Sequence, residues 1–500
     1  MDLPAQDMTN ALRSGLVTRN IRRRCTRAAL TVGAVAVAFG AATVVSPGGG
    51  GIALAGDPLG AGGEFHALSP ERILDTRLPG LDVAPLGRKP VTRLEDGVPF
   101  EVDVLGKGGL PGFVDEDRDG YDDRVLAVVV SIIAVAPTRI GYLRAFPTGA
   151  EEGNTSVVNF VRGSVVPNSA IIRPGLGGKI SVRLVTPESP GLTDVVIDIS
   201  GWFSTSNPSN ERGARLIPIS PMRAYDSGLG QFGSRLIGPR QQIKVPIRGA
   251  VDANSPGQPV PNDGNIVGVV VNVTGENLYP GSRPTHLSAL PGPVAPGAEP
   301  STSTVNLSAG QVRANLAILP VGADGSIHVF NLAGELRIVI DIMGYLIRGA
   351  DVTTREGRVI PLVAPFRAFD TREAEFMKQP LGPARAEDWS FDSFVHDVNI
   401  DGAGVGLQSG LLGNLTATNL QRQYSWAPVL SYMTAYPSPG TAGGTPPEFS
   451  NLNIPEGESV PNLSLLRYGG DSTDPFQLRF YNRAGYVDYL LDVYAVVLTD

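Results

Sequence analysis

Cysteine is almost missing from this chain of 500 residues, and that scarcity sets the first limit on its chemistry. The only cysteine, Cys25, lies before the apolar segment Ala28–Val45. The lipidated cysteine of an exported lipoprotein would follow such a segment. If cleavage occurs after Ala55, the remaining protein has no cysteine, which excludes disulfide bonds and thiol chemistry.

Histidine and the common catalytic spacings are also scarce. The chain has four histidines, His66, His286, His328 and His396, with no His-x-x-x-His pair among them. No Gly-x-Ser-x-Gly motif and no phosphate-binding glycine loop after a strand are present. A carboxylate pair for glycoside hydrolysis stays open, because its spacing is spatial. However, the acids of this chain that recur do so in all three of its sequence repeats, whereas a catalytic site is expected in one repeat only. We therefore predict that the protein is not an enzyme.

Charged residues make up only 18% of the chain, and the formal net charge is −8. Residues 1–55 contain six arginines and two aspartates, so their removal would change the net charge to −12. This acidity argues against nucleic acid and anionic lipid as partners. With 61 glycines, 42 prolines and 42% hydrophobic residues, the composition is typical of an all-β protein with many tight turns.

The first 55 residues differ from the rest and predict a signal peptide. Five arginines between Arg19 and Arg27 precede the uncharged segment Ala28–Val45, and Ala53-Leu54-Ala55 offers small residues for signal peptidase. An uncleaved membrane anchor is the alternative, because 18 apolar residues are just long enough to span a bilayer. The arginine cluster also allows export by the twin-arginine route, although the usual apolar residues do not follow it directly.

What the chain has in abundance is internal repetition. A Pro-x-Arg-x-x-Asp-hydroxyl motif occurs three times, in 69–77, 220–228 and 364–372, with the arginines 151 and 144 residues apart. Further landmarks follow each copy in the same order. Each copy is followed by two asparagines and then by one acid in a closing aliphatic strand: Asn159, Asn168 and Asp198; Asn306, Asn315 and Asp341; Asn453, Asn462 and Asp492. A repeat of this length predicts one domain per copy.

We therefore predict three units: unit one, 67–204; unit two, 214–348; and unit three, 358–500. The polar linkers 205–213 and 349–357 predict a loose string of domains. In unit one, short β-branched runs predict about eight strands, and no run has the period of an amphipathic helix. This pattern favours an all-β fold in which each unit is an antiparallel β-sandwich. A β-trefoil is the alternative, but no threefold sub-repeat is visible inside a unit.

These motifs resemble the tandem β-rich repeats of secreted actinobacterial proteins. The resemblance rests on Pro-x-Arg-x-x-Asp-Thr-Arg, a long valine run, a Gly-Tyr-Leu-x-x-Phe-Pro strand and an ending such as Val-Ile-Asp-Ile-x-Gly-Tyr, and it covers about residues 67–500. It implies a repeat found in arrays or appended to cell-wall hydrolases and other exported enzymes, and not itself catalytic. Unit two departs by placing Gly228 where the second arginine belongs, and unit three by ending on Ala495-Val496.

The repeated arginines and acids predict ion pairs that hold strands together. Arg72 or Arg77 is expected to reach Asp75 or Asp198, with the same logic for Arg223 with Asp341 and Arg367 with Asp492, because a buried acid needs a partner. A ligand-binding pair is the alternative. The repeated asparagines suit bridging between backbone segments.

A calcium site is the sharpest chemical prediction. The loop 115–123 places acids at positions 1, 3, 5 and 9, with Gly120 at position 6 for the sharp turn. Position 12 is Leu126 and no helices flank the loop, so it is not an EF-hand. The predicted ligands are four carboxylates and one backbone carbonyl: Asp115, Asp117, Asp119, Asp123 and the carbonyl of Tyr121. A solvated acidic turn is the alternative.

Unit three carries a partial copy of this loop, and unit two does not. The stretch 397–402 contains Asp397, Asn399, Asp401 and Gly402, but Val405 stands at its ninth position, which predicts a weaker site. In unit two only Asn262-Asp263-Gly264 remains, which we interpret as a turn.

Together these features predict a secreted or cell-surface, non-enzymatic protein with a structural or adhesive role, in which calcium rigidifies unit one. Its expected partners are extracellular proteins or glycans, and repeated weak contacts would add through avidity. A carbohydrate-binding array is the alternative, with four aromatic candidates for sugar stacking: Tyr142, Trp202, Trp389 and Trp426. A cryptic hydrolase would need a cleft with a perturbed acid pair in a single unit.

Overall fold

The computed structural model describes most of the chain after residue 61. The described residues are 18–20, 62–78, 94–95, 97–205, 212–229, 233, 235–252, 260–279, 281–349, 354–373, 376, 379–397, 408–422, 429–440 and 445–500. Nearly all regular structure in them is β-strand, so the predicted all-β class is confirmed. The predicted signal peptide lies outside the described residues, apart from Thr18–Asn20.

Unit one contains eight main strands, and a ninth, very short strand. They are β2 (Phe65–Asp75), β3 (Leu94–Glu95), β4 (Phe100–Asp103), β5 (Val125–Val135), β6 (Gly141–Pro147), β7 (Val158–Phe160), β8 (Val165–Ile172), β9 (Lys179–Val185) and β10 (Leu192–Ser204). A single 3-10 turn, η1 (Leu176–Gly178), precedes β9. For β8 the β-branched run of the sequence predicts only a strand over Ala170–Arg173, because Pro167 argues against a strand before it. The strand nevertheless begins at Val165, since β8 lies at the edge of its sheet, where proline is tolerated.

Units two and three repeat the eight strands. Unit two has β11 (Ala214–Asp226), β12 (Gln241–Pro246), β13 (Ile266–Glu276), β14 (Thr285–Leu290), β15 (Val305–Leu307), β16 (Val312–Pro320), β17 (Ser326–Asn331) and β18 (Arg337–Arg348). Unit three has β19 (Val359–Asp370), β20 (Arg385–Ser390), β21 (Gln408–Gln421), β22 (Leu430–Pro437), β23 (Leu452–Pro455), β24 (Val460–Arg467), β25 (Gln477–Asn482) and β26 (Tyr486–Leu498). Unit three also has a short helix, α2 (Asp392–Asp397).

The strands of each unit are connected in the same way. Counting the eight main strands of a unit in order, one sheet runs first, eighth, third, sixth, as in β2-β10-β5-β8. The other sheet runs second, seventh, fourth, fifth, as in β4-β9-β6-β7. Two four-stranded antiparallel sheets with these crossed connections form a jelly roll. We call the two kinds the 1-8-3-6 sheet and the 2-7-4-5 sheet.

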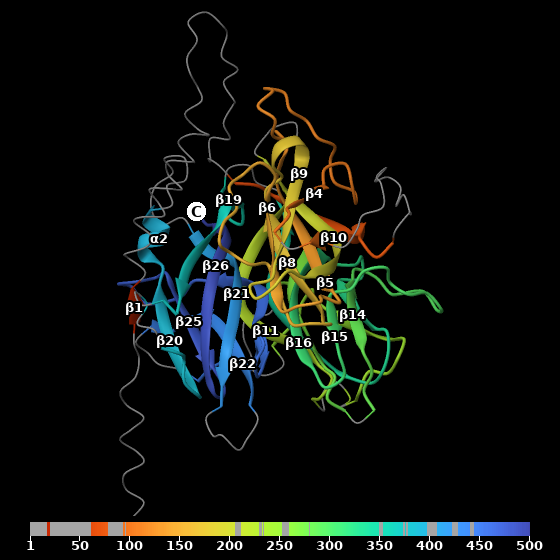
Figure 1. Cartoon of the computed structure of the whole chain (residues 1–500). Helices are drawn as coiled ribbons and strands as arrows, with labels where there is room; N and C mark the ends of the chain where they lie inside the picture. Colours follow the sequence, from red (N-terminus) through yellow and green to blue (C-terminus); the bar gives the residue numbers. More distant parts are fainter. Residues whose placement is uncertain are drawn as a thin grey trace, which may run out of the picture.

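The three units do not form the string that the linkers predicted. Each has its own apolar core between its two sheets. A fourth core contains buried side chains from all three units, including Phe65, Met343 and Tyr494. In Figure 1 the three coloured regions accordingly lie side by side in one body. The length of the linkers limits only the distance between the units. Burial of the apolar outer faces of their sheets explains why the units pack against one another instead.

The shared core explains the long apolar runs of the sequence. In β5, Val128, Val130 and Ile132 face the core of unit one, whereas Ala127 and Val129 face the shared core. Both faces of the 1-8-3-6 sheet are therefore buried, so its middle strand reads as continuously apolar instead of alternating. The apolar run in the sequence therefore indicated that the units pack against one another. A β-sandwich with one solvent-exposed face per sheet does not account for it.

The contacts between units include backbone pairing. Ala214 of β11 pairs with Phe65 of β2, which joins two 1-8-3-6 sheets into one larger sheet. Gly63 and Val359 exchange hydrogen bonds of 2.8 and 3.0 Å, and Leu216 N donates to Gly357 O at 2.8 Å. The beginnings of the three units thus meet at one place.

Two further observations concern the N-terminal region and membranes. β1 (Thr18–Asn20) runs parallel to β20, with Thr18 opposite Asp388.

The predicted apolar segment Ala28–Val45 lies outside the described residues. In the part of the chain that the structure describes, no helix is long and apolar enough to cross a membrane.

Candidate metal loop and the repeated ion clusters

The acidic loop of unit one lies between β4 and β5. Carboxylate oxygens of Asp115, Asp117 and Asp123 all lie within 4.8 Å of one another. This is the one group of three or more possible histidine, cysteine or acid ligands among the described residues. Oxygen ligands from several carboxylates are what Ca²⁺ prefers, so the cluster has suitable donors for this ion.

One predicted carboxylate ligand and one further acid of the loop have other positions. Asp119 lies outside the three-carboxylate group, and its Oδ1 accepts a hydrogen bond from Tyr121 N at 2.8 Å. Asp122, which was not a predicted ligand, caps the start of β5. Its Oδ1 accepts from Arg124 N at 2.9 Å and from Val125 N at 2.7 Å. Three acids of the nine-residue loop therefore converge, whereas Asp119 and Asp122 accept backbone hydrogen bonds outside that group.

The turn of the loop depends on Gly120. Its φ is +92°, a conformation that side chains rarely adopt, and its N–H donates to Asp115 Oδ2 at 3.0 Å. Asp119 N donates to Asp117 Oδ1 at 3.1 Å. These bonds orient two of the three converging carboxylates, and Gly120 has the role that the sequence predicted.

The loop is attached to the framework on two sides. Gly177 N of η1 donates to Gly120 O at 3.0 Å. At the end of β10, the Thr205 hydroxyl donates to Asp123 O at 2.8 Å. A metal at this loop would therefore fix a segment that contacts both η1 and the start of the linker to unit two.

The weaker loop predicted in unit three is not placed. Residues 398–402 lie outside the described residues, as do the side chains of His396 and Asp397. The calcium prediction for this unit stays a prediction.

The repeated arginine and acids form the same ion cluster in every unit. Arg72 Nε donates to Asp198 at 2.9 Å, and Arg72 Nη1 to Asp75 at 3.4 Å. Arg223 and Arg367 make the equivalent contacts to Asp341 with Asp226 and to Asp492 with Asp370. Each cluster joins the first strand of a unit to its last strand, so the predicted structural pairing is confirmed.

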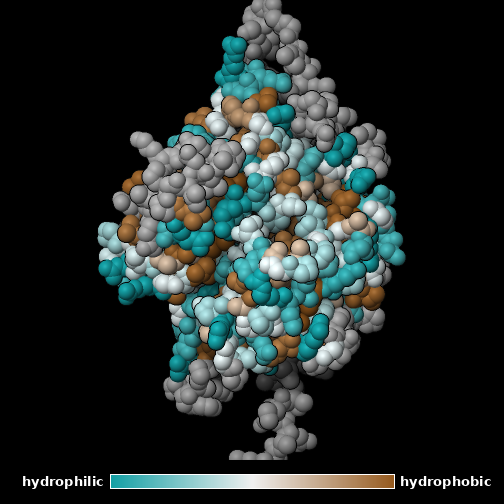
Figure 2. Space-filling view, turned by 90° about the vertical axis from the view of Figure 1, so that its right-hand side faces the viewer, coloured by the Kyte–Doolittle hydropathy of each residue, from teal (hydrophilic) through white to brown (hydrophobic). Residues whose placement is uncertain are grey.

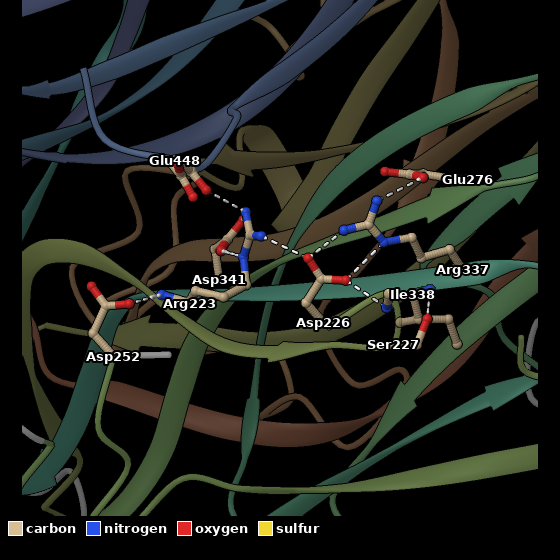
Figure 3. A network of polar contacts seen from close by, with 10 residues as sticks. Arg223, Asp226, Ser227, Asp252, Glu276, Arg337, Ile338, Asp341 and Glu448 are labelled. Atoms are coloured by element: carbon tan, nitrogen blue, oxygen red, sulfur yellow. Dashed lines mark hydrogen bonds and ion pairs between the residues drawn. The ribbon is translucent and has the colours of Figure 1, made fainter. Parts of the chain in front are cut away.

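A second arginine completes each cluster, but its origin differs. Arg77 donates two hydrogen bonds to Asp75, at 2.8 and 2.6 Å, and Arg372 does the same to Asp370. In unit two Gly228 replaces this arginine. There Arg337, from the start of β18, donates to Asp226 at 2.7 and 2.6 Å (Figure 3).

The Arg337 guanidinium occupies the space that a side chain at position 228 would need. A Cβ atom on Gly228 would lie 2.2 Å from Arg337 Nε, so the glycine makes room for the guanidinium. In units one and three the position of Arg337 is held by Asp194 and Asp488, which accept from Thr76 and Thr371. The departure at Gly228 was visible in the sequence, but its compensation 109 residues later was missed.

Burial and pairing have opposite effects on the two acids of each cluster. Burial raises the pKa of Asp341 to about 6 although Arg223 contacts it, and the same cause raises the pKa of Asp198 and Asp492. Burial also acts on Asp75, Asp226 and Asp370, but their hydrogen bonds and the charges of both neighbouring arginines together outweigh it and lower their pKa.

The second asparagine of each unit bridges backbone segments as predicted, whereas the first, Asn159, Asn306 or Asn453, donates to a serine hydroxyl three residues earlier. Asn168 Nδ2 donates to Val157 O at 2.7 Å, Asn315 Nδ2 to Thr304 O at 2.8 Å, and Asn462 Nδ2 to Asn451 O at 2.7 Å. The same geometry in three units indicates a structural role.

The aromatic candidates for sugar stacking do not form a platform among the described residues. Trp389 is buried and stacks on Phe369, with ring centroids 4.0 Å apart. Trp202 is buried and stacks on His66 at the same distance. Tyr142 is half-buried beneath Arg144, and Trp426 lies outside the described residues. Figure 2 shows one face on which hydrophilic residues cover much of the surface between smaller hydrophobic groups.

Comparison with known proteins gives no family. The chain matches no protein-family model and no curated protein. Three similar solved structures have a TM-score of 0.15. They are described as the triple jelly roll fold and turret assembly in an archaeal virus (8% identity, covering 87% of this chain and 91% of that one), the tandem CBM22-1-CBM22-2 domain of Paenibacillus barcinonensis Xyn10C (11%, 57% and 99%) and Sulfolobus Turreted Icosahedral Virus (11%, 87% and 92%). Similarity at this level supports no functional assignment.

Proposed function

We propose that this chain is an exported, non-enzymatic structural protein of the cell surface, in which calcium rigidifies unit one. The observation that carries the proposal is the use of the repeated charges. In all three units the recurring arginines and acids pair with one another between the first and last strands. Residues engaged in this way stabilise strands and are not available to act on a substrate.

The association of the units favours a structural role over an adhesive array. Avidity requires binding modules that reach separate contacts. Here buried side chains of all three units share one core. We therefore propose a single rigid body that contacts extracellular proteins or glycans through its outer surface. The glycan-binding alternative has no comparable support, because two of its four aromatic candidates are buried.

The calcium part of the proposal rests on Asp115, Asp117 and Asp123. Their mutual repulsion would be relieved by a divalent cation, and the neighbouring turn is already formed by Gly120. The metal would offset part of the negative charge of the loop and hold it against η1 and Thr205, without taking part in any reaction.

A calcium titration of the full chain tests this proposal. We expect heat of binding by calorimetry and a higher melting temperature. At a calcium concentration 100 times the Kd, the stabilisation should be about 2.7 kcal/mol. The double variant D117N/D123N should lose both effects. The matched control D119N should retain them, because Asp119 lies outside the carboxylate group.

Two results would contradict the proposal. Equal binding in D117N/D123N and the unmodified chain would place the cation elsewhere, and no binding in either would remove the metal from the proposal. The export part is tested separately by fractionation of expressing cells. Recovery only in the cytoplasm would refute it whatever the calcium result.

A further inference from the structure

Buried asparagines hold the units to one another as well as holding each unit together. One set is Asn168, Asn315 and Asn462 in β8, β16 and β24. A second set lies on the third strand of each unit, opposite the buried acid. Its members are Ser131 opposite Asp198, Asn272 opposite Asp341, and Asn414 opposite Asp492.

Three hydrogen bonds join unit two to unit three. Asn272 Nδ2 donates to Ser450 O at 2.6 Å, and Asn462 Nδ2 donates to Asn272 Oδ1 at 2.9 Å. Leu316 N donates to Asn462 Oδ1 at 2.9 Å. Both polar atoms of each asparagine side chain are therefore used, as buried amides require.

The same three bonds join unit three to unit one. Asn414 Nδ2 donates to Ser156 O at 2.8 Å, and Asn168 Nδ2 donates to Asn414 Oδ1 at 2.9 Å. Leu463 N donates to Asn168 Oδ1 at 3.0 Å. The residues correspond one by one to those of the previous junction, so the junctions follow a threefold pattern.

The junction between units one and two departs from this pattern. Ser131 stands where the other units have asparagine. Ser131 Oγ and Asn315 Oδ1 are both buried and have no hydrogen-bond partner among the described residues. Ser169 N corresponds to Leu316 N and Leu463 N, but it donates at 2.9 Å to Asn168 of its own unit.

We propose that this junction contains a hydration site for one buried water molecule, which bridges Ser131 Oγ and Asn315 Nδ2. Asn315 Nδ2 corresponds to Asn462 Nδ2 and Asn168 Nδ2, but among the described residues it donates only to Thr304 O. A serine side chain has two heavy atoms fewer than asparagine, so the amide that accepts from Nδ2 at the other two junctions is missing here. The Ser303 carbonyl, which corresponds to those of Ser450 and Ser156, is the third expected partner. Buried waters typically make about three hydrogen bonds to such groups.

The charges around the site favour neutral water over an ion. Asp198 is the acid opposite Ser131, and it already accepts hydrogen bonds from Arg72 at 2.9 and 3.4 Å. Ser131 Oγ and Asn315 Nδ2 belong to uncharged side chains. A buried ion would need an opposite charge, and Asp198 is already paired with Arg72.

Replacing Ser131 with alanine in the full chain tests the proposal. With the water in place, S131A removes one of its partners, and we expect the melting temperature to fall by about 1–3 °C. Without a water, S131A removes only an unpaired buried hydroxyl, and stability would stay equal or rise. That second result would overturn the inference. N272S is the matched control, since it breaks two bonds at a complete junction and should lower the melting temperature further.

A high-resolution crystal structure of the unmodified chain and of S131N provides the direct check. We expect a water within hydrogen-bond distance of Ser131 Oγ and Asn315 Nδ2, replaced in S131N by the new amide. A dry site in the unmodified chain would overturn the proposal even if S131N were more stable.

Discussion

The ion clusters of units one and two have the same acids but take their second arginine from different strands. Arg77 follows β2 directly and reaches back two residues to Asp75. In unit two the arginine comes from β18, and Arg337 reaches Asp226 from across the sheet. Each guanidinium group donates two hydrogen bonds to its carboxylate. The geometry of the ion pair is therefore the same in both units, although the arginine comes from a different place in the sequence.

The surrounding residues change together with the arginine. Position 337 is an acid in the other units, Asp194 and Asp488, and position 228 is an arginine in both. Glu276 lies opposite Arg337 in the sheet, where units one and three have Val135 and Thr418. A buried carboxylate thus requires a bidentate partner, but more than one strand can supply it.

The largest effect is expected from removing the arginine that all units share. R223A would leave Asp341 buried without its partner and would also remove the bond from Arg223 Nη2 to Glu448 O at 2.6 Å. Loss of one member of a buried pair costs about 3–5 kcal/mol. R72A should cost less, because the Arg72 side chain is 25% exposed, against 12% for Arg223. Urea unfolding measures both values, and an equal cost would contradict this order.

A smaller loss is expected when both arginines are forced into unit two. G228R places a side chain where Arg337 lies, and overpacking of this kind costs about 1–3 kcal/mol. The variant G228R/E276T/R337D gives unit two the residues of unit three at all three positions. We expect it to regain most of the lost stability in thermal unfolding. If the triple variant were less stable than G228R, the residues at positions 228, 276 and 337 could not be exchanged together between units two and three.

The smallest net effect is expected in the pH dependence, because the acids of a cluster oppose each other. The pKa of Asp341 is raised to about 6, so the folded state holds its proton where the unfolded state has lost it. Its contribution to stability therefore falls as the pH rises from about 4 to 6. The lowered pKa of Asp226 has the opposite sign, and its contribution is lost as the pH falls below about 4.

D341N isolates the first of these contributions. Across pH 4 to 6 the stability of the unmodified chain should decrease relative to that of D341N, as measured by urea unfolding at several pH values. A constant difference over this window would show that Asp341 titrates as an ordinary aspartate.

Part of the fold could be predicted from the sequence because the relevant signals are local. Turn residues and short β-branched runs indicated about eight strands in unit one, and the recurring Arg72 and Asp198 indicated a cross-strand pair. The acidic loop was recognisable from its spacing. Which of its acids converge was not, because a backbone turn directs Asp119 toward Tyr121 N and Asp122 toward β5.

The sequence by itself determined the repeat, the all-β class and the residues that need partners. Only the tertiary structure decided that the units associate, that Arg337 replaces the missing arginine of unit two, and that Ser131 interrupts the asparagine pattern. The physical reason is the range of the interactions. Strand period and turn chemistry act over a few residues, whereas a shared core joins residues such as Phe65 and Tyr494 that are far apart in the chain.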